Sequence, residues 1–229
     1  MYNINFWESE FTLCQYSDKL VSLLESLNKQ VAKPVNIHEV KKSCYVARKY
    51  HGDQLRKSGD PYYSHPLEVG YLFSNYAGIE DAKHYTTDLV ITAILHDTIE
   101  DTELTKDMIA TIFNKSIADK VEDLTRIKFD RKFTAAESVI SLFLEHKDDV
   151  LHVKLFDRLH NMRTLDAMKP EKQHRIAQET ADYFILLPAY LSIKLSKVGE
   201  ELQNLCSKYL HIQPKLIPTQ ETKSYLYLG

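Results

Sequence analysis

Glycine is scarce in this sequence, with six residues among 229. They stand at positions 52, 59, 70, 78, 199 and 229, and neither GxGxxG nor GxxxxGK[ST] can be built from them. The glycine-rich dinucleotide-binding fold and the P-loop are therefore excluded. Scarce glycine together with few runs of β-branched residues favours an all-helical protein.

Cysteine is also rare, and Cys14, Cys44 and Cys206 stand far apart along the chain. They form no CxxC pair, so neither a disulfide framework nor a structural zinc site is indicated. We expect these cysteines to be reduced, in a cytoplasmic protein.

The sequence has no excess of positive charge, because 29 Lys and Arg stand against 32 Asp and Glu. A dedicated nucleic-acid binder usually shows a strong basic excess, so no nucleic-acid partner is expected. No window reaches the roughly 18 apolar residues that cross a bilayer. The N-terminus lacks the basic and then apolar pattern of a signal peptide, so no membrane association is expected either.

Helical periodicity and helix-start signals recur along the whole chain and predict an all-α fold of about ten helices, with no convincing hairpin. Capping signals stand at Asn36 with Glu39 and at Thr134 with Glu137. The expected helices are 17–31, one from 36, 66–76, 87–101, 105–113, 116–124, one from 134, one from 148 or 149 past 162, one from 170 toward Pro188, and 194–210. We expect a helical extension over 1–35, a main domain over 36–210 and a tail over 211–229.

Four polar residues follow the apolar run 89–95 directly: His96, Asp97, Glu100 and Asp101. On one continuous helix they would lie within an arc of roughly 140°. Three carboxylates at the end of a buried helix need a cation, and a divalent metal would supply it. The alternative is that the helix emerges into solvent here and these residues are its polar end.

Two further residues, His65 and Asp157, become candidate metal ligands when they are considered together with this group. His65 alone would be an ordinary surface or capped histidine, and Asp157 alone a helix-surface residue paired with Arg158. Together with His96 and Asp97 they supply two imidazoles and two carboxylates. This mixed nitrogen and oxygen set without thiolate suits a six-coordinate Mn²⁺ better than structural zinc, and it leaves positions open for water and substrate.

The order His, His-Asp, Asp resembles the signature of the HD superfamily of metal-dependent phosphohydrolases. Three segments are similar to the hydrolase domain of the RelA/SpoT alarmone enzymes, as is the pair Glu179-Thr180: HGDQLRKSGDPYYSHP (51–66), LHDTIEDT (95–102) and KLFDRLHNMRTL (154–165). The resemblance runs from about residue 46 to about residue 210. It implies an HD-domain architecture for the helical bundle.

The resemblance also implies roles for individual residues. One Mn²⁺ per chain would bind to His65, His96, Asp97 and Asp157. Glu100 and Asp101 would be the catalytic acidic pair. The implied nucleotide contacts are Arg56, Lys57, Ser58, Asn161 and Thr164. The implied reaction removes pyrophosphate from the 3′ position of (p)ppGpp and gives GDP or GTP, and the partner is this small nucleotide substrate.

The chain departs from the family pattern at three places. Asp53 stands where the family commonly has glycine, and Gly52 comes one residue earlier. Phe156 replaces a usual alanine, and Leu186-Leu187-Pro188 replaces the usual P-L-A. No metal-binding or acidic position is lost.

The resemblance leaves other activities open. Relatives remove the 2′-phosphate of NADPH or neutralise toxins by acting on adenosine alarmones. A non-catalytic alarmone sensor could dispense with Glu100 and Asp101, yet both are present. Only 19 residues follow Leu210, so we expect a small stand-alone alarmone hydrolase. The sequence indicates neither a toxin partner nor an oligomeric state.

A basic run comprises Arg126, Lys128, Arg131 and Lys132. Two interpretations stay open: a mobile loop that contacts the far phosphates of the substrate, or a solvated surface loop.

Overall fold

The computed structural model describes residues 6–125, 127–128, 131–191 and 196–211. Their regular secondary structure is almost entirely helical, as the sequence predicts, and the chain divides into two compact units, 1–160 and 161–229. Within the described residues, no helix combines the length and the apolar content that crossing a membrane requires.

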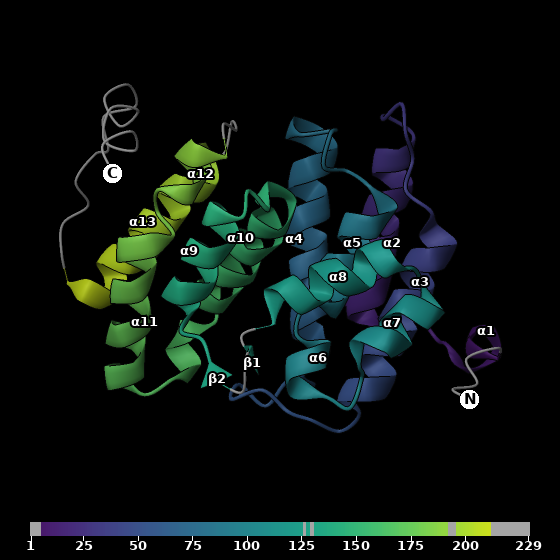
Figure 1. Ribbon diagram of the computed structural model, residues 1–229, viewed down its shortest axis with the longest axis horizontal. Coiled ribbons are helices and arrows are strands. Elements are labelled where there is room, and N and C mark those ends of the chain that lie inside the picture. The colour runs from purple at the N-terminus through teal and green to yellow at the C-terminus, as the bar shows by residue number, and fades with distance from the viewer. Residues whose placement is uncertain (1–5, 126, 129–130, 192–195, 212–229) are drawn as a thin grey trace. The chain divides into compact units, whose positions relative to one another are not determined.

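The first unit contains most of the helices (Figure 1). They are α1 (Trp7–Glu10), α2 (Gln15–Asn28), α3 (Ile37–His51), α4 (Ser64–Glu80), α5 (Thr87–Leu95), α6 (Thr98–Asp101), α7 (Lys106–Ile112), α8 (Lys115–Leu124), α9 (Ala135–Leu144) and most of α10 (Asp148–Arg163). Short helices such as α1 and α6, of four residues each, add to those expected from the sequence.

Helix α4 is central to this unit, packing against α2 and α5. The packing is close because α4 carries glycine where its neighbours approach. A Cβ atom on Gly70 would lie 2.9 Å from Cγ1 of Ile94, and one on Gly78 would lie 2.7 Å from Cδ1 of Leu27. The predicted helix 17–31 corresponds to α2, and the apolar face of α2 is part of the core.

Helix α10 also contacts α4. The ring of Phe156 lies 5.3 Å from the ring of Tyr76 and 6.1 Å from that of Phe73, centroid to centroid. Phe156, which replaces the usual alanine of the family, is thus a buried core residue. The next residue, Asp157, is turned about 100° around the helix and points to a different region.

Several predicted helix starts are confirmed by side-chain caps. Asn36 accepts a hydrogen bond from the backbone N–H of Glu39, and Thr134 forms a complete capping box with Glu137. Three starts differ by one or two residues, because α2 begins after Cys14, α4 begins at Ser64 and α8 is capped by Asn114. The end of α4 also lies beyond the predicted residue 76, at Glu80. These caps satisfy backbone donors that have no partner inside the helix.

The predicted continuous helix 87–101 is wrong, because α5 ends at Leu95 and α6 begins at Thr98. The hydroxyl of Thr98 donates to the carbonyl oxygen of Leu95 at 2.7 Å and so takes the place of a helical backbone donor there. Thr102 similarly bonds the carbonyl of Thr98. His96 and Asp97 therefore lie at a break between two helices, and the arc expected from one regular helix does not apply.

A small antiparallel ladder that the sequence did not predict joins β1 (Ile127–Lys128) to β2 (Arg131–Lys132). It carries the basic run. The guanidinium of Arg131 pairs with Glu137 at 2.9 Å. Arg126 and the side chains of Lys128 and Lys132 lie outside the described residues, so both interpretations of the run stay predictions.

The second unit holds η1 (Leu165–Ala167), α11 (Pro170–Tyr183), α12 (Leu187–Tyr190) and α13 (Ser196–Leu210), and α13 packs on both α11 and α12. Pro170 opens α11 as predicted. The long helix from 170 ends before Pro188, which lies in the first turn of α12. Of the predicted tail 211–229, all but His211 lies outside the described residues.

Candidate metal centre

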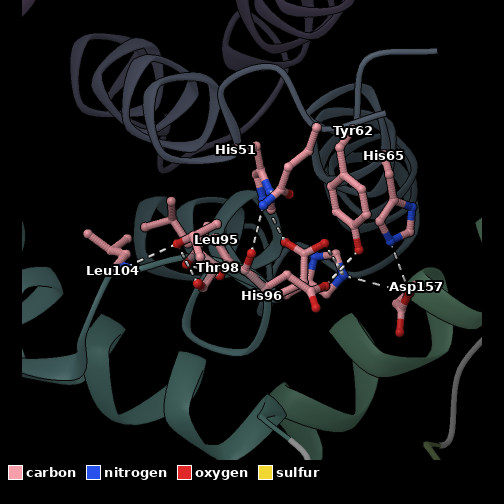
Figure 2. A network of polar contacts seen from close by, with 12 residues as sticks. His51, Tyr62, His65, Leu95, His96, Thr98, Leu104 and Asp157 are labelled. Atoms are coloured by element: carbon pink, nitrogen blue, oxygen red, sulfur yellow. Dashed lines mark hydrogen bonds and ion pairs between the residues drawn. The ribbon is translucent and has the colours of Figure 1, made fainter. Parts of the chain in front are cut away.

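Three of the four predicted ligands come together in the first unit. His65 lies near the start of α4, His96 follows α5, and Asp157 lies on α10. The Nε2 atoms of His65 and His96 lie 3.3 Å and 3.6 Å from Oδ1 of Asp157. One ligand atom from each residue lies within 4.8 Å of the other two. Figure 2 shows His65 and Asp157 pointing toward each other from their two helices.

The imidazole of His96 is oriented by its own helix. Its Nδ1 lies 2.9 Å from the carbonyl oxygen of Ala93, which fixes the proton on Nδ1 and directs Nε2 toward the cluster. Burial disfavours the charged form, but the carboxylates of Asp97 and Asp157 outweigh burial and raise the pKa of His96 to about 9. A cation at this position is therefore electrostatically favoured, be it a proton or a metal.

A second histidine positions His65. Nδ1 of His65 lies 2.8 Å from Nδ1 of His160, so one of the two rings donates to the other. Burial lowers the pKa of His65, which favours the neutral imidazole that a metal requires. With its Nδ1 engaged by His160, His65 presents Nε2 to Asp157.

The fourth predicted ligand, Asp97, lies at the edge of the cluster. Its Oδ1 faces Nε2 of His51 at 3.3 Å, and its Oδ2 lies 3.9 Å from Nε2 of His96. Oδ2 is buried and has no hydrogen-bond partner within the described part of the chain. Burial disfavours the carboxylate, but the positive charge near His96 and the hydrogen bond from His51 hold the pKa of Asp97 below its usual range.

These observations fit a divalent metal. A buried carboxylate oxygen without a partner is costly, and a cation is the ligand that satisfies it best. The donors are imidazole nitrogens and carboxylate oxygens, which are ordinary ligands of divalent metal ions. The interpretation of Asp157 as a surface residue does not hold, because its side chain is 16% exposed and faces two imidazoles.

The acidic pair lies on the short helix α6, directly after the break. The hydroxyl of Tyr62 donates to Oδ2 of Asp101 at 2.7 Å, and the amide of Gln54 donates to the Asp101 carbonyl oxygen. Asp101 is exposed and Glu100 is half-buried. Both residues are therefore accessible to water, on the helix that follows His96 and Asp97 directly.

The segment that carries Arg56, Lys57 and Ser58 forms a tight turn between α3 and α4. The N–H of Arg56 donates to the carbonyl oxygen of Asp60 at 2.9 Å, and the Ser58 hydroxyl donates to the Asp60 carboxylate. Arg56 is half-buried, whereas Lys57 and Ser58 are exposed. The turn is thus ordered and presents a cationic side chain.

The first departure from the family pattern leaves this turn intact. Gly52 takes a positive φ of 50° as the residue that ends α3, so the glycine has moved by one position and still serves the sharp change of direction. Asp53, which stands at the usual glycine position, is exposed.

Two of the predicted nucleotide contacts, Asn161 and Thr164, lie in the second unit. Both are half-buried, and the Thr164 hydroxyl lies 3.4 Å from the carbonyl oxygen of Asn161. Their role toward the substrate stays a prediction. Thr180 of the predicted Glu179-Thr180 pair is buried and donates to the carbonyl of Ile176.

Sequence reasoning missed the residues that support the cluster, above all His51 and Tyr62. Their rings stack at 4.7 Å between centroids. A signal for His51 was present, because it continues the apolar stripe of Val40, Cys44 and Ala47 on α3. A histidine on a buried helical face needs a polar partner, which here is Asp97. Tyr62 and His160 carried no comparable signal.

Residues 43–192 match the family model described as HD domain. The chain belongs to the HD domain family. HD domains are metal-dependent, which agrees with the cluster of histidine and aspartate ligands described above.

Curated relatives agree with this family. The chain is 39% identical over 183 residues to GTP pyrophosphokinase rsh of Brucella ovis. The aligned segment covers 77% of this chain and 23% of that relative. This HD domain chain is 36% identical over 195 residues to guanosine-3′,5′-bis(diphosphate) 3′-pyrophosphohydrolase of Aquifex aeolicus. That alignment covers 83% of this chain and 27% of the Aquifex protein. The chain thus spans about a quarter of the length of these relatives.

A solved structure supports the fold. It is described as a metazoan ortholog of SpoT that hydrolyzes ppGpp, and it aligns with a TM-score of 0.57 and 20% identity, over 74% of this chain and 94% of the other. At this identity the likeness supports the HD fold alone.

Proposed function

We propose that this HD domain hydrolyses the 3′-pyrophosphate of (p)ppGpp, giving GDP or GTP and pyrophosphate. One observation carries the proposal: His65, His96 and Asp157 converge in a chain that is 36% identical to a protein named guanosine-3′,5′-bis(diphosphate) 3′-pyrophosphohydrolase. A relative in Synechocystis has the same name, marked as probable. It is 40% identical over 179 residues, which cover 73% of this chain and 22% of the Synechocystis protein.

In this proposal His65, His96, Asp97 and Asp157 hold one Mn²⁺, and the unpartnered Oδ2 of Asp97 supports the fourth ligand. The bound ion would neutralise phosphate charge and make a nearby water more acidic. Two imidazoles and two carboxylates, with further positions left for water and substrate, suit a six-coordinate Mn²⁺ better than a four-coordinate structural zinc. The contacts of His96 Nδ1 with Ala93 and of His65 Nδ1 with His160 support this proposal, because they leave Nε2 of each ring for a metal.

Glu100 and Asp101 take the proton from the attacking water. The hydroxyl of Tyr62 donates to Oδ2 of Asp101, which leaves Oδ1 as the oxygen for proton transfer in this proposal. Positioned carboxylates of this kind contribute about 10²–10⁴-fold in rate. Arg56 on its ordered turn binds the nucleotide through its planar cation, which suits both phosphate and a purine face. Lys57 and Ser58 add charge and hydrogen bonds at the same turn.

Product analysis tests this function. Purified protein is incubated with Mn²⁺ and, in separate reactions, with ppGpp, pppGpp, pppApp or NADPH, and products are separated by anion exchange. We expect GDP from ppGpp and GTP from pppGpp, each with an equal amount of pyrophosphate. Phosphate release from NADPH with no product from the alarmones would contradict the proposal and indicate a different phosphatase. Binding of ppGpp without turnover would contradict it and indicate an alarmone sensor.

A further inference from the structure

A second group of ligand-forming side chains lies in the first unit, distinct from the cluster of His65, His96 and Asp157. It comprises Asp81, His84 and His152, and one ligand atom from each lies within 4.8 Å of the other two. Asp81 follows the last residue of α4 as its C-cap, His84 lies in the loop before α5, and His152 lies in the second turn of α10. Three separate segments of the chain meet here.

The side chain of His152 has a buried nitrogen atom that lacks a hydrogen-bond partner within the described residues. It is 1% exposed, and its Nδ1 lies 2.6 Å from the carbonyl oxygen of Asp148, so the proton sits on Nδ1. Its Nε2 is therefore a lone-pair acceptor. This atom is buried without a hydrogen-bond partner within the described part of the chain, and it faces Oδ2 of Asp81 at 3.6 Å. A carboxylate oxygen has no proton to offer it, so the approach of the two atoms is unfavourable without a cation between them.

The other two residues complete a set of donors. Nδ1 of His84 pairs with Oδ2 of Asp81, and the rings of His84 and His152 lie 4.2 Å apart between centroids. An ion pair accounts for Asp81 and His84, but it leaves Nε2 of His152 unexplained. Tetrahedral zinc with bonds of about 2.0–2.1 Å places its ligand atoms roughly 3.3 Å apart, close to the 3.6 Å between Nε2 of His152 and Oδ2 of Asp81. Nδ1 of His84 is hydrogen-bonded directly to the same Oδ2, so the His84 ring must turn away from that oxygen to bind the same ion.

His84 also gives the cluster an approach from solvent. It lines a cavity of about 610 Å³ whose charged walls include Asp88, Asp148 and Asp149, with Lys83 and Lys120 opposite in sign. An ion can therefore reach the cluster through His84.

We propose that Asp81, His84 and His152 form a second divalent-metal site that takes Zn²⁺. Two imidazoles and one carboxylate are a common zinc ligand set, and water supplies the fourth position. The ion ties the end of α4 and the following loop to the start of α10. Because α10 carries Asp157 little more than one turn later, this site stabilises the helix that serves the proposed active centre without contacting substrate.

Zinc titration of metal-stripped protein tests the site apart from the proposed function. The Asp157→Ala variant, which lacks a central ligand of the first cluster, is titrated with Zn²⁺ against a chromophoric chelator, and its melting temperature is measured. We expect it to take up one equivalent of Zn²⁺ tightly and to melt at a higher temperature with zinc. Adding His152→Ala should abolish both effects, whereas adding His174→Ala, an exposed histidine, should abolish neither.

A second variant, His84→Ala, keeps the test valid if loss of the buried His152 prevents folding. His84 is only partly buried, and its removal should weaken zinc binding by at least tenfold. Zinc uptake that is unchanged by both substitutions, or its absence from folded Asp157→Ala protein, would overturn the proposal. Either outcome is independent of whether the wild-type protein hydrolyses ppGpp.

Discussion

The buried polar residues of the first cluster are held in pairs, and each pair leaves one ligand atom directed inward. Ala93 and His160 engage the Nδ1 atoms of His96 and His65, and His51 engages one oxygen of Asp97. Burial disfavours the charged form of His51, but the hydrogen bond to Asp97 and the charge of that carboxylate outweigh burial, so the net pKa of His51 is raised. Such supporting partners fix tautomer and direction before any metal arrives.

At the residue scale, the division between metal ligands and proton acceptors gives a sharp prediction. The double change Glu100→Gln with Asp101→Asn keeps shape but removes both bases. We expect a folded protein that binds Mn²⁺ and ppGpp normally and turns over at least about a hundredfold more slowly. Calorimetry and initial rates check this.

The control for this experiment is Glu103→Gln, because Glu103 is an exposed carboxylate just beyond α6. It should keep the wild-type rate. Loss of Mn²⁺ affinity in the double variant would instead place the pair among the metal ligands.

The sequence predicted that His65, His96 and Asp157 belong to one group, and the structure brings them together. Their binding of a metal stays a prediction. The partners of these side chains could not be predicted from the sequence. Tyr62 and His160 are ordinary in the sequence, and only folding brings them to Asp101 and His65. Pairings across 39 and 95 residues depend on tertiary packing, which local patterns do not encode.

At the scale of elements, the longer helices followed from periodicity and caps, whereas the four-residue helices α1 and α6 and the break at His96-Asp97 did not. The run 89–95 and the four polar residues after it fit one helix by pattern. The break depends on a hydrogen bond from the Thr98 hydroxyl to Leu95, and threonine inside a helix often makes such bonds without ending it. The register of the acidic residues was therefore not predictable from spacing alone.

The N-terminal helix α2 gives a prediction at this scale. Leu24 is fully buried, and on α2 it shares a helical face with Leu20 and Leu27, which lie against Gly70 and Gly78 of α4. Leu24→Ala should lower the free energy of unfolding by about 2–5 kcal/mol, since it removes apolar contacts and leaves a cavity. The matched control Glu25→Ala, on the exposed face, should change it by less than about 0.5 kcal/mol. Urea unfolding followed by circular dichroism measures both, and equal midpoints would show that α2 lies outside the cooperative core.

At the scale of the molecule, a metal at the first cluster would join parts of the chain that are far apart in sequence. His65, His96 and Asp157 come from α4, the α5–α6 break and α10. An ion bound only by the folded state stabilises it by mass action, by about 2.7 kcal/mol at a hundred times the dissociation constant. Metal removal should therefore lower the melting temperature.

The effect of metal on stability should depend on pH. In metal-free protein the pKa of His96 is raised to about 9, so its proton stabilises the fold fully below its unfolded pKa of about 6.5 and less and less as the pH rises toward 9. Mn²⁺ must displace this proton. We expect the rise in melting temperature caused by Mn²⁺ to be larger at pH 8.5 than at pH 6. Thermal scans with and without EDTA at both pH values measure it, and a larger rise at pH 6 would contradict the role given to His96.

The most direct measurement of the central claim is the rate of ppGpp hydrolysis as a function of Mn²⁺ concentration, for wild-type protein and for Asp157→Asn. Asp166→Asn, which changes an exposed aspartate paired with Lys208, is the matched control. We predict saturable activation of the wild type and of Asp166→Asn, with GDP and pyrophosphate formed in equal amounts. Asp157→Asn should be at least about a hundredfold slower at every Mn²⁺ concentration. Wild-type rates in Asp157→Asn, or turnover that persists unchanged in EDTA, would contradict the assignment of this cluster as the metal centre of the reaction.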